Sequence, residues 1–300
     1  METQKGKLNL FGKNRELRKA INLIIKNPLA LLGVGIIIVL IATALFASYI
    51  APYPEQGRGL SNLSERLMPP SLKHPFGTDN LGRDILSRIM FGTRISLKAA
   101  VIVVLFVIII GVPLGLIAGY FGGKMDEIIM RFADMILAFP SLLLAIVIVA
   151  FLGPSLINAL IAISVPWWPW YTRLVRSQVL SLREMQFVES ARAIGASRMR
   201  IMFRHILPNS LSPVIVQATL DMGYIILYLA ALGFLGLGTQ PPEADWGVMV
   251  SDGRDFFMKQ WWLSTFSGAA VFFTVLAFNF LGDGIREALD PKVRGKFQRR

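Results

Sequence analysis

The chain has 300 residues, of which 54% are hydrophobic and 17% are charged, and its formal net charge is +12. Soluble domains carry about 25% charged residues, so this composition excludes an ordinary soluble fold and indicates a membrane protein with several spans. The absence of cysteine excludes disulfides and thiolate metal sites, and His74 and His205 lie too far apart in sequence to predict a metal site.

Six apolar segments approach the ~20 residues that a helix needs to cross a bilayer. They are residues 28–50, 96–120, 133–152, 155–171, 213–235 and 263–282. The first segment follows a basic stretch and has no small-residue cleavage site, so we expect a retained anchor instead of a removed signal peptide. The predicted fold is an all-α membrane protein with six transmembrane helices.

The basic residues predict the orientation of these spans. If both termini are cytoplasmic, the cytoplasmic segments hold 22 of the 31 Lys and Arg residues, which is the bias expected of cytoplasmic loops. The predicted parts are a cytoplasmic tail (1–27), the first span (28–50), an extracytoplasmic loop (51–95), a core of five spans (96–290) and a basic cytoplasmic tail (291–300). The basic residues are spread over four segments without base-stacking aromatics, which argues against nucleic acid as a partner.

The extracytoplasmic loop begins with a proline-rich stretch that prevents long helices. From Leu81 the pattern changes, because apolar residues then recur on one helical face. We expect a helix in the outer membrane interface that ends before residue 96. Two interpretations remain open: a lid that shields the spans, and a gate edge or docking surface for an external protein.

Small and aromatic residues mark two of the spans. Gly111, Gly115 and Gly119 form a small-xxx-small row, which predicts a close helix contact. Trp167, Trp168 and Trp170 lie near the predicted cytoplasmic end of the fourth span. These tryptophans either belong to an interfacial aromatic belt or line a translocation path.

The loop at 172–209 has the pattern of two short amphipathic helices. Met199, Met202, Phe203 and Ile206 recur at helical spacing, and Gly195 separates this stripe from an earlier one. Glycine permits a sharp corner, and Pro208 marks re-entry into the membrane. We expect a projecting knob that contacts a partner, because exposed apolar patches mark contact surfaces. The alternative is an ordinary solvated loop.

Asp221 is the only acid deep inside a predicted span, since Asp134 stands at the second residue of the segment 133–152. A carboxylate near the bilayer centre costs about 2.5–3.5 kcal/mol on insertion scales, so it normally faces a cavity or a partner. Three interpretations remain open: contact with the substrate or pathway, a position at a helix end, and a hydrogen bond between subunits.

Several motifs resemble those of one transporter family. Glu189, Ser190, Ala191, Gly195, Leu207 and Pro208 resemble the EAA loop of ABC-importer permeases. Residues 74–79, 81–84, 119–120, 138–140, 234–238, 246–247 and 279–283 are similar to motifs of the second permease subunit of dipeptide, oligopeptide and nickel ABC importers. The likeness covers nearly the whole chain.

The resemblance implies a type I importer permease fold and a set of partners. These are a second homologous permease subunit, two ABC ATPase subunits, an extracytoplasmic substrate-binding protein and membrane lipid. It also implies that Glu189, Ala191, Gly195, Leu207 and Pro208 couple the permease to an ATPase.

The chain is not expected to be an enzyme or to hold a cofactor. The Gly-Gly-Lys run at 122–124 is followed by Met125, and Ala118 stands where a Walker A motif requires glycine. ATP and Mg²⁺ would therefore be bound by the partner ATPases.

The predicted function is the permease subunit of an ATP-driven importer that moves di- and oligopeptides across the cytoplasmic (inner) membrane. Oligosaccharides and nickel chelates remain alternative substrates. A secondary transporter is the alternative of a different class, but it would need coupling-ion groups at mid-membrane and usually an inverted repeat. The sequence shows one acid deep inside a predicted span, Asp221, and no convincing repeat.

Overall fold

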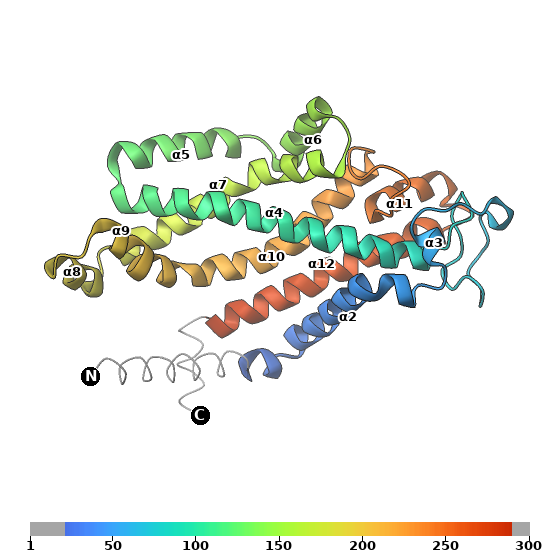
Figure 1. Cartoon of the computed structure of the whole chain (residues 1–300), viewed down its shortest axis with the longest axis horizontal. Coiled ribbons are helices and arrows are strands. Elements are labelled where there is room, and N and C mark those ends of the chain that lie inside the picture. The colour runs from blue at the N-terminus through green and yellow to red at the C-terminus, as the bar shows by residue number, and fades with distance from the viewer. Residues whose placement is uncertain (1–21, 290–300) are drawn as a thin grey trace.

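The computed structural model describes residues 22–289, and the regular secondary structure in this part is helical. The long helices run along one axis of the molecule (Figure 1). They are α2 (Pro28–Ile50), α4 (Ile85–Phe121), α7 (Leu156–Leu182), α10 (Leu207–Phe234) and α12 (Trp262–Leu289). Of the two predicted tails, 1–27 and 291–300, the structure describes residues 22–27, and the rest lies outside the described residues.

The helical fold is confirmed, and four helices of residues 22–289 are long and apolar enough to cross a membrane. These are α2, α4, α12 and the continuous stretch Arg198–Phe234, which contains α10. The boundaries of α2 coincide with the predicted first span, because Asn27 caps its first turn and Pro28 fits the first helical position.

The predicted third span, 133–152, is wrong as a continuous helix. It is divided between α5 (Gly123–Leu137) and α6 (Ser141–Leu152), which meet at 84° and count as a fifth crossing only if taken together. The cause is Pro140, which has no N–H and disfavours helical backbone at Phe139.

Helix α7 is longer than the predicted fourth span, 155–171, and is not one of the four apolar helices. Pro166 and Pro169 lie inside it, and its last turns continue to Leu182. The three tryptophans therefore lie near the middle of a helix about 40 Å long, which extends beyond the predicted end of the span.

Helix α4 corrects the prediction of a separate interfacial helix. Leu81 lies in a turn, α4 begins at Ile85, and the Asp84 side chain accepts a hydrogen bond from the Ser87 N–H at 2.8 Å. From there the helix continues to Phe121 over about 55 Å, well beyond a ~30 Å hydrocarbon core. Residues 85–95 are thus the outer turns of a span.

Helices α4 and α7 pack closely through the predicted glycine row. A Cβ atom on Gly111 would lie 2.7 Å from Tyr171 Cβ, and a Cβ atom on Gly119 would lie 2.7 Å from Val179 Cβ. No larger residue fits without separating the helices, which confirms the row as a helix contact.

The loop between α2 and α4 has a polar interior. His74 is fully buried, its Nδ1 lies 2.9 Å from Asp84 Oδ1, and its Nε2 lies 3.1 Å from Glu65 Oε2. The loop also contacts α12, because the Trp262 indole N–H donates to the Thr78 carbonyl oxygen at 3.3 Å. The loop is therefore a folded unit that lies at one end of the bundle.

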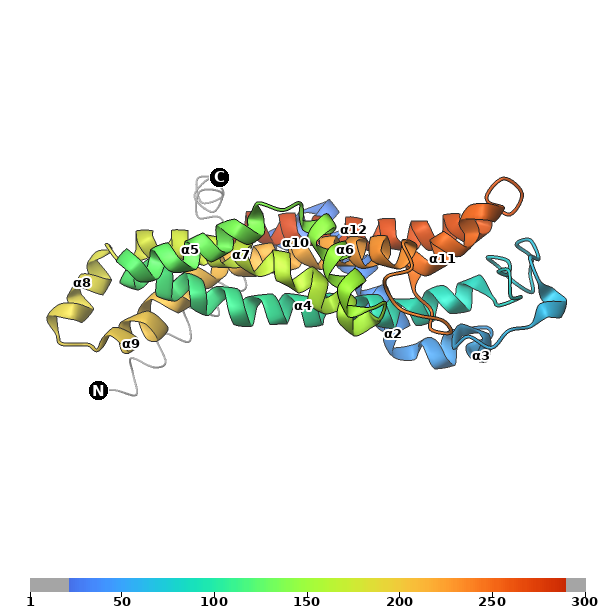
Figure 2. The same ribbon diagram turned by 90° about the horizontal axis from the view of Figure 1, so that it is seen from above.

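The two ends of the elongated molecule differ (Figure 2). The loop after α2, with α3 (Pro54–Gly57), and α11 (Trp246–Gly253) occupy one end, and α8 (Gln186–Ala193) occupies the other. The start of α2 lies beside the end of α12, since Asn27 Nδ2 donates to Glu287 Oε2 at 3.0 Å.

Candidate functional sites in a projecting corner and a bundle cavity

The corner at the α8 end follows directly from local sequence. After α8, Gly195 has a φ of +77°, and its N–H donates to the Arg192 carbonyl oxygen at 3.0 Å. The chain then enters α9 (Arg198–Arg200), which the Ser197 side chain caps. Because a positive φ is costly for residues with a Cβ, glycine at 195 permits this reversal.

The apolar residues of the corner divide into two sets. Val188, Ala191, Met202 and Ile206 are buried and hold the arms of the corner together. Phe187, Ile194, Met199 and Phe203 are exposed, with Ile194 at 84%. The predicted stripe of Met199, Met202, Phe203 and Ile206 therefore does not form one face, and its outer half leaves an apolar patch at the tip of the molecule.

Glu189 lies in the first turn of α8, is exposed, and forms no ion pair with any residue between 22 and 289. The loop offers several arginines with which this glutamate could pair, but the structure shows no such pair within residues 22–289. Its position suits the positive end of the helix dipole, and its carboxylate is free to contact another chain.

The corner joins α10 through an irregular helix. Residues Ile201–Ile206 form a π-helix (η2), a form that is rare and frequent at functional sites. Pro208 follows in the first turn of α10, where its missing N–H interrupts the regular bonding pattern. Leu207 is half-buried beside it.

A cavity of about 700 Å³ lies between α7 and α10, near the middle of both helices. Its lining residues are Ser141, Trp167, Trp170, Arg173, Leu174, Gln217, Asp221, Tyr224 and Tyr228. The structure thus brings together Asp221, Trp167 and Trp170 of the predicted path. Trp168 does not line the cavity and packs against the core, because consecutive helical residues point in different directions.

Asp221 is 3% exposed and lies well inside α10, so its predicted alternative position at a helix end is wrong. Gln217 Nε2 donates to Asp221 Oδ1 at 2.9 Å. Oδ2 is buried and has no hydrogen-bond partner among the described residues. The Trp167 and Tyr228 rings meet edge to face beside it, with centroids 4.6 Å apart.

The second charged residue of the cavity is already neutralised. Arg173 forms an ion pair with Asp134 of α5. Among the lining residues, Asp221 is therefore the charged side chain without an ionic partner.

Sequence reasoning missed Gln217, Tyr224 and Tyr228. They lie four residues before, three after and seven after Asp221, which is the spacing of one helical face. A polar and aromatic stripe centred on an intramembrane acid was the signal that could have found them.

A second cavity of about 430 Å³ shares Leu174 and Gln217 with the first. It continues along α10 toward Pro213 and reaches Arg286 of α12. The two cavities together follow one face of α10 toward the end of the bundle that carries the corner.

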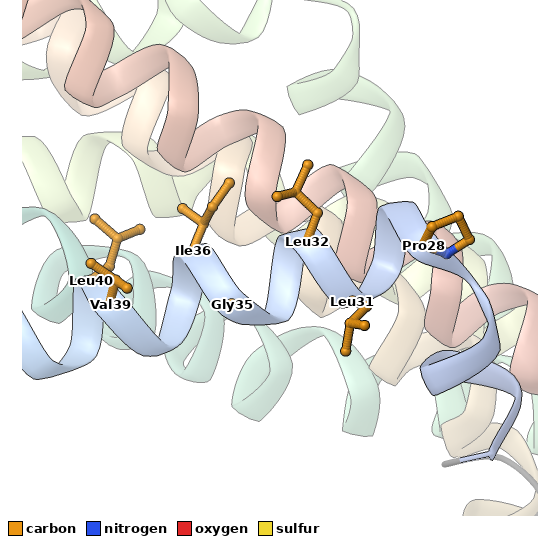
Figure 3. Close-up of a pocket in the computed structure, with 7 residues that line it drawn as sticks. All are labelled: Pro28, Leu31, Leu32, Gly35, Ile36, Val39 and Leu40. Atoms are coloured by element: carbon orange, nitrogen blue, oxygen red, sulfur yellow. The ribbon is translucent and has the colours of Figure 1, made fainter.

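A groove on α2 has different chemistry (Figure 3). It is lined by Pro28, Leu31, Leu32, Gly35, Ile36, Val39 and Leu40, which are apolar and come from one helix. It offers no charge or hydrogen-bonding side chain, so it suits lipid and not a polar substrate. Within residues 22–289, no cluster of His, Cys, Asp and Glu has the arrangement of a metal site.

Comparisons with known families cover most of the chain. Residues 111–295 match the family described as binding-protein-dependent transport system inner membrane component. Residues 17–70 match the N-terminal TM domain of oligopeptide transport permease C.

Similar proteins align over nearly their full length. A dipeptide transport system permease protein of Alkalihalophilus pseudofirmus is 51% identical over 92% of this chain and 90% of its own. A probable D,D-dipeptide transport system permease protein of Escherichia coli K12 is 45% identical over 90% of both chains. A glutathione transport system permease protein of Pectobacterium atrosepticum is 45% identical over 86% of this chain and 85% of its own.

Solved structures share the fold at low identity. An inward-facing MetNI methionine ABC transporter matches with a TM-score of 0.54 and 20% identity, over 67% of this chain and 96% of that chain. A second crystal form gives a TM-score of 0.52 over 66% of this chain.

Proposed function

This chain belongs to the binding-protein-dependent transport system inner membrane component family, and from that premise we propose that it is the permease subunit of an ATP-driven importer of short peptides. It is a multi-pass protein of the inner membrane. The observation that carries the peptide assignment is its 51% identity, over nine-tenths of both chains, to a dipeptide transport permease.

The proposed topology has six crossings with both termini in the cytoplasm. Helices α2, α4, α7, α10 and α12 supply five crossings, and the bent pair α5 and α6 supplies the sixth. In support, successive passes alternate in direction along the long axis (Figure 1). The segment 172–209 is also basic, as cytoplasmic loops are.

The proposed coupling surface is the corner around Gly195. Its exposed apolar residues and Glu189 form a rigid projection that a groove on an ATPase subunit would hold. Ala191 keeps the arms of the corner in contact, and Leu207 and Pro208 connect it to α10. ATP and Mg²⁺ would be bound by that partner, since this chain carries no Walker A motif.

The proposed translocation path follows the cavity at Asp221, Trp167 and Trp170. Asp221 and Gln217 are polar groups deep in the bundle, and lipid contact with such groups is unfavourable. We therefore expect a second, homologous permease subunit to cover this face and to enclose the path. Trp168 would support the residues that line the path, from the side that faces away from the cavity.

The proposed complex contains two ATPase subunits in total. An extracytoplasmic binding protein would deliver the substrate to it. Tryptophan-lined cavities also suit sugar rings, so an oligosaccharide is the second candidate substrate. The relatives named for dipeptide transport favour peptides.

The decisive experiment is ATP hydrolysis by the reconstituted four-subunit complex with its binding protein. Peptide-loaded binding protein should stimulate hydrolysis, and oligosaccharide-loaded binding protein should not. A complex that assembles but responds to neither refutes the peptide assignment. Peptide uptake that persists without ATP and follows an ion gradient would instead identify a secondary transporter.

A further inference from the structure

Resting on the proposed function, we propose that the cavity between α7 and α10 binds the free ammonium group of a peptide, with Asp221 as its acceptor. The aromatic side chains of the cavity form the walls of this site. The permease itself would then select against peptides with a blocked amino terminus, in addition to any selection by the binding protein.

The charge of the cavity favours a cation. Arg173 is paired with Asp134, so the carboxylate of Asp221 is the uncompensated charge among the lining residues. A carboxylate in a protected cavity attracts cations more strongly than one in water, because the effective dielectric constant is lower.

One oxygen of that carboxylate is buried and lacks a hydrogen-bond donor. Asp221 is 97% buried by side-chain packing, since 3% of its surface is exposed, and Oδ2 has no hydrogen-bond partner within residues 22–289. The Tyr171 hydroxyl lies close to this carboxyl group and is itself buried without another hydrogen-bond partner within residues 22–289. Buried carboxylate oxygens are nearly always hydrogen-bonded, and an ammonium group brings three donors.

The aromatic side chains that line the cavity also suit an ammonium group. Trp167 and Tyr228 pack edge to face, and Trp170 and Tyr224 are about half exposed toward the cavity. Aromatic faces attract ammonium groups through cation–π interactions. Gln217, which donates to Oδ1, would hold the carboxylate in place during binding.

The size of the cavity suits the end of a small peptide. Its volume of about 700 Å³ lies in the range of small-molecule sites. The adjoining cavity begins at Gln217, so the rest of a bound chain can extend along α10.

The test measures binding to the assembled permease and ATPase complex in lipid nanodiscs, without the binding protein. Radiolabelled dialanine is displaced by dialanine, by N-acetyl-dialanine, or by dialanine amide, in which the carboxyl group is blocked. We expect dialanine and its amide to bind about tenfold or more tightly than the N-acetyl form, as expected for a hydrogen bond to a charged group. Asp221→Asn should remove this preference, and Asp221→Glu should retain it.

Two matched variants separate recognition from folding. Thr219 lies two residues away on α10, is half-buried, and its hydroxyl donates a hydrogen bond to the Ile215 carbonyl oxygen. Thr219→Val and Tyr171→Phe should both keep the amine preference. Each variant is first checked for co-purification with the ATPase.

Three results would overturn the inference: equal binding of dialanine and N-acetyl-dialanine to the wild type, no binding of dialanine to the wild type, or an amine preference that survives Asp221→Asn. The same preparations are tested for ATP hydrolysis with peptide-loaded binding protein. If hydrolysis responds and the amine preference is absent, only this inference fails. If hydrolysis never responds, the proposed function fails.

Discussion

The side-chain amide of Asn209 donates to the carbonyl oxygen of His205 at 2.6 Å, across the position of Pro208. The π-helix ends at Ile206, just after His205, and Pro208, which lies between the two residues, has no backbone N–H to donate. A side chain therefore supports the junction between the coupling corner and α10.

Replacing Asn209 by alanine should loosen this junction. The loss of one hydrogen bond to a backbone carbonyl should cost about 1 kcal/mol locally. Hydrogen exchange should then increase in 201–206 and stay unchanged in α2. Asn209→Asp, which cannot donate, should give the same result, whereas Asn209→Gln should restore part of the protection.

Gly195→Pro should uncouple ATP hydrolysis from transport while leaving membrane insertion intact. Proline fixes φ near −65°, which is incompatible with the φ of +77° at this position. Peptide uptake and ATP hydrolysis in proteoliposomes measure the effect.

Gly195→Ala should have a weaker effect, because a Cβ atom there meets nothing within 4 Å and only the backbone strain of about 1–2 kcal/mol remains. Gly268→Ala in α12 is the control, since its nearest neighbour is 4.0 Å away. Wild-type transport by Gly195→Pro would contradict our account of the corner.

Gly111→Ala should lower the thermal stability of the complex. The added Cβ atom collides with α7, and overpacking of this kind costs about 1–3 kcal/mol. Gly35→Ala is the matched control in α2, because its Cβ atom meets nothing and alanine favours a helix. Unfolding temperatures that fall equally in both variants would argue against close α4–α7 packing.

The outer loop should lose stability in acid. A hydrogen bond from Lys73 lowers the pKa of Glu65 below its ordinary value of 4.5. Because the folded-state pKa is the lower one, this contribution is complete above about pH 4.5 and is lost as the pH falls through the lowered pKa. Hydrogen exchange over 62–84 should therefore accelerate in acid, and Glu65→Gln should make this loop less dependent on pH.

His74→Ala should open the same loop at neutral pH. It would leave Asp84 without its ring contact in a buried position, at a cost of about 1–3 kcal/mol. Limited proteolysis of 54–84 should then be faster than in the wild type. Unchanged proteolysis would show that the buried histidine does not hold the loop together.

The sequence predicts a span well where chemistry marks both of its ends. Asn27 and Pro28 mark the start of α2, and Pro52 follows its end. The end of α7 was misplaced because hydropathy falls at Arg173 although the helix continues to Leu182. A hydropathy pattern marks where the apolar residues stop and not where the helix ends, so it did not show that the tryptophans lie near the middle of α7.

The candidate sites were predictable to different degrees. The positive φ of Gly195 followed from glycine at a corner between two amphipathic patterns, and the cavity position of Asp221 followed from the cost of burying a charge. The outward orientation of Met199 and Phe203 could not be predicted from the sequence, because a π-helix changes the angular spacing of side chains.

The continuity of α4 has a mechanical consequence. Its first turn is capped by Asp84 inside the outer loop, and near its other end the Gly119 carbonyl oxygen accepts a hydrogen bond from Arg183 Nη1 at 2.9 Å, just before the coupling corner. Helix α4 therefore joins the two ends of the protein, and Pro113 inside it, which has no backbone N–H, is a position at which the helix can bend. If the corner couples to an ATPase as proposed, a push on it would tilt the half of α4 before Pro113 only to the extent that the helix does not bend at this proline.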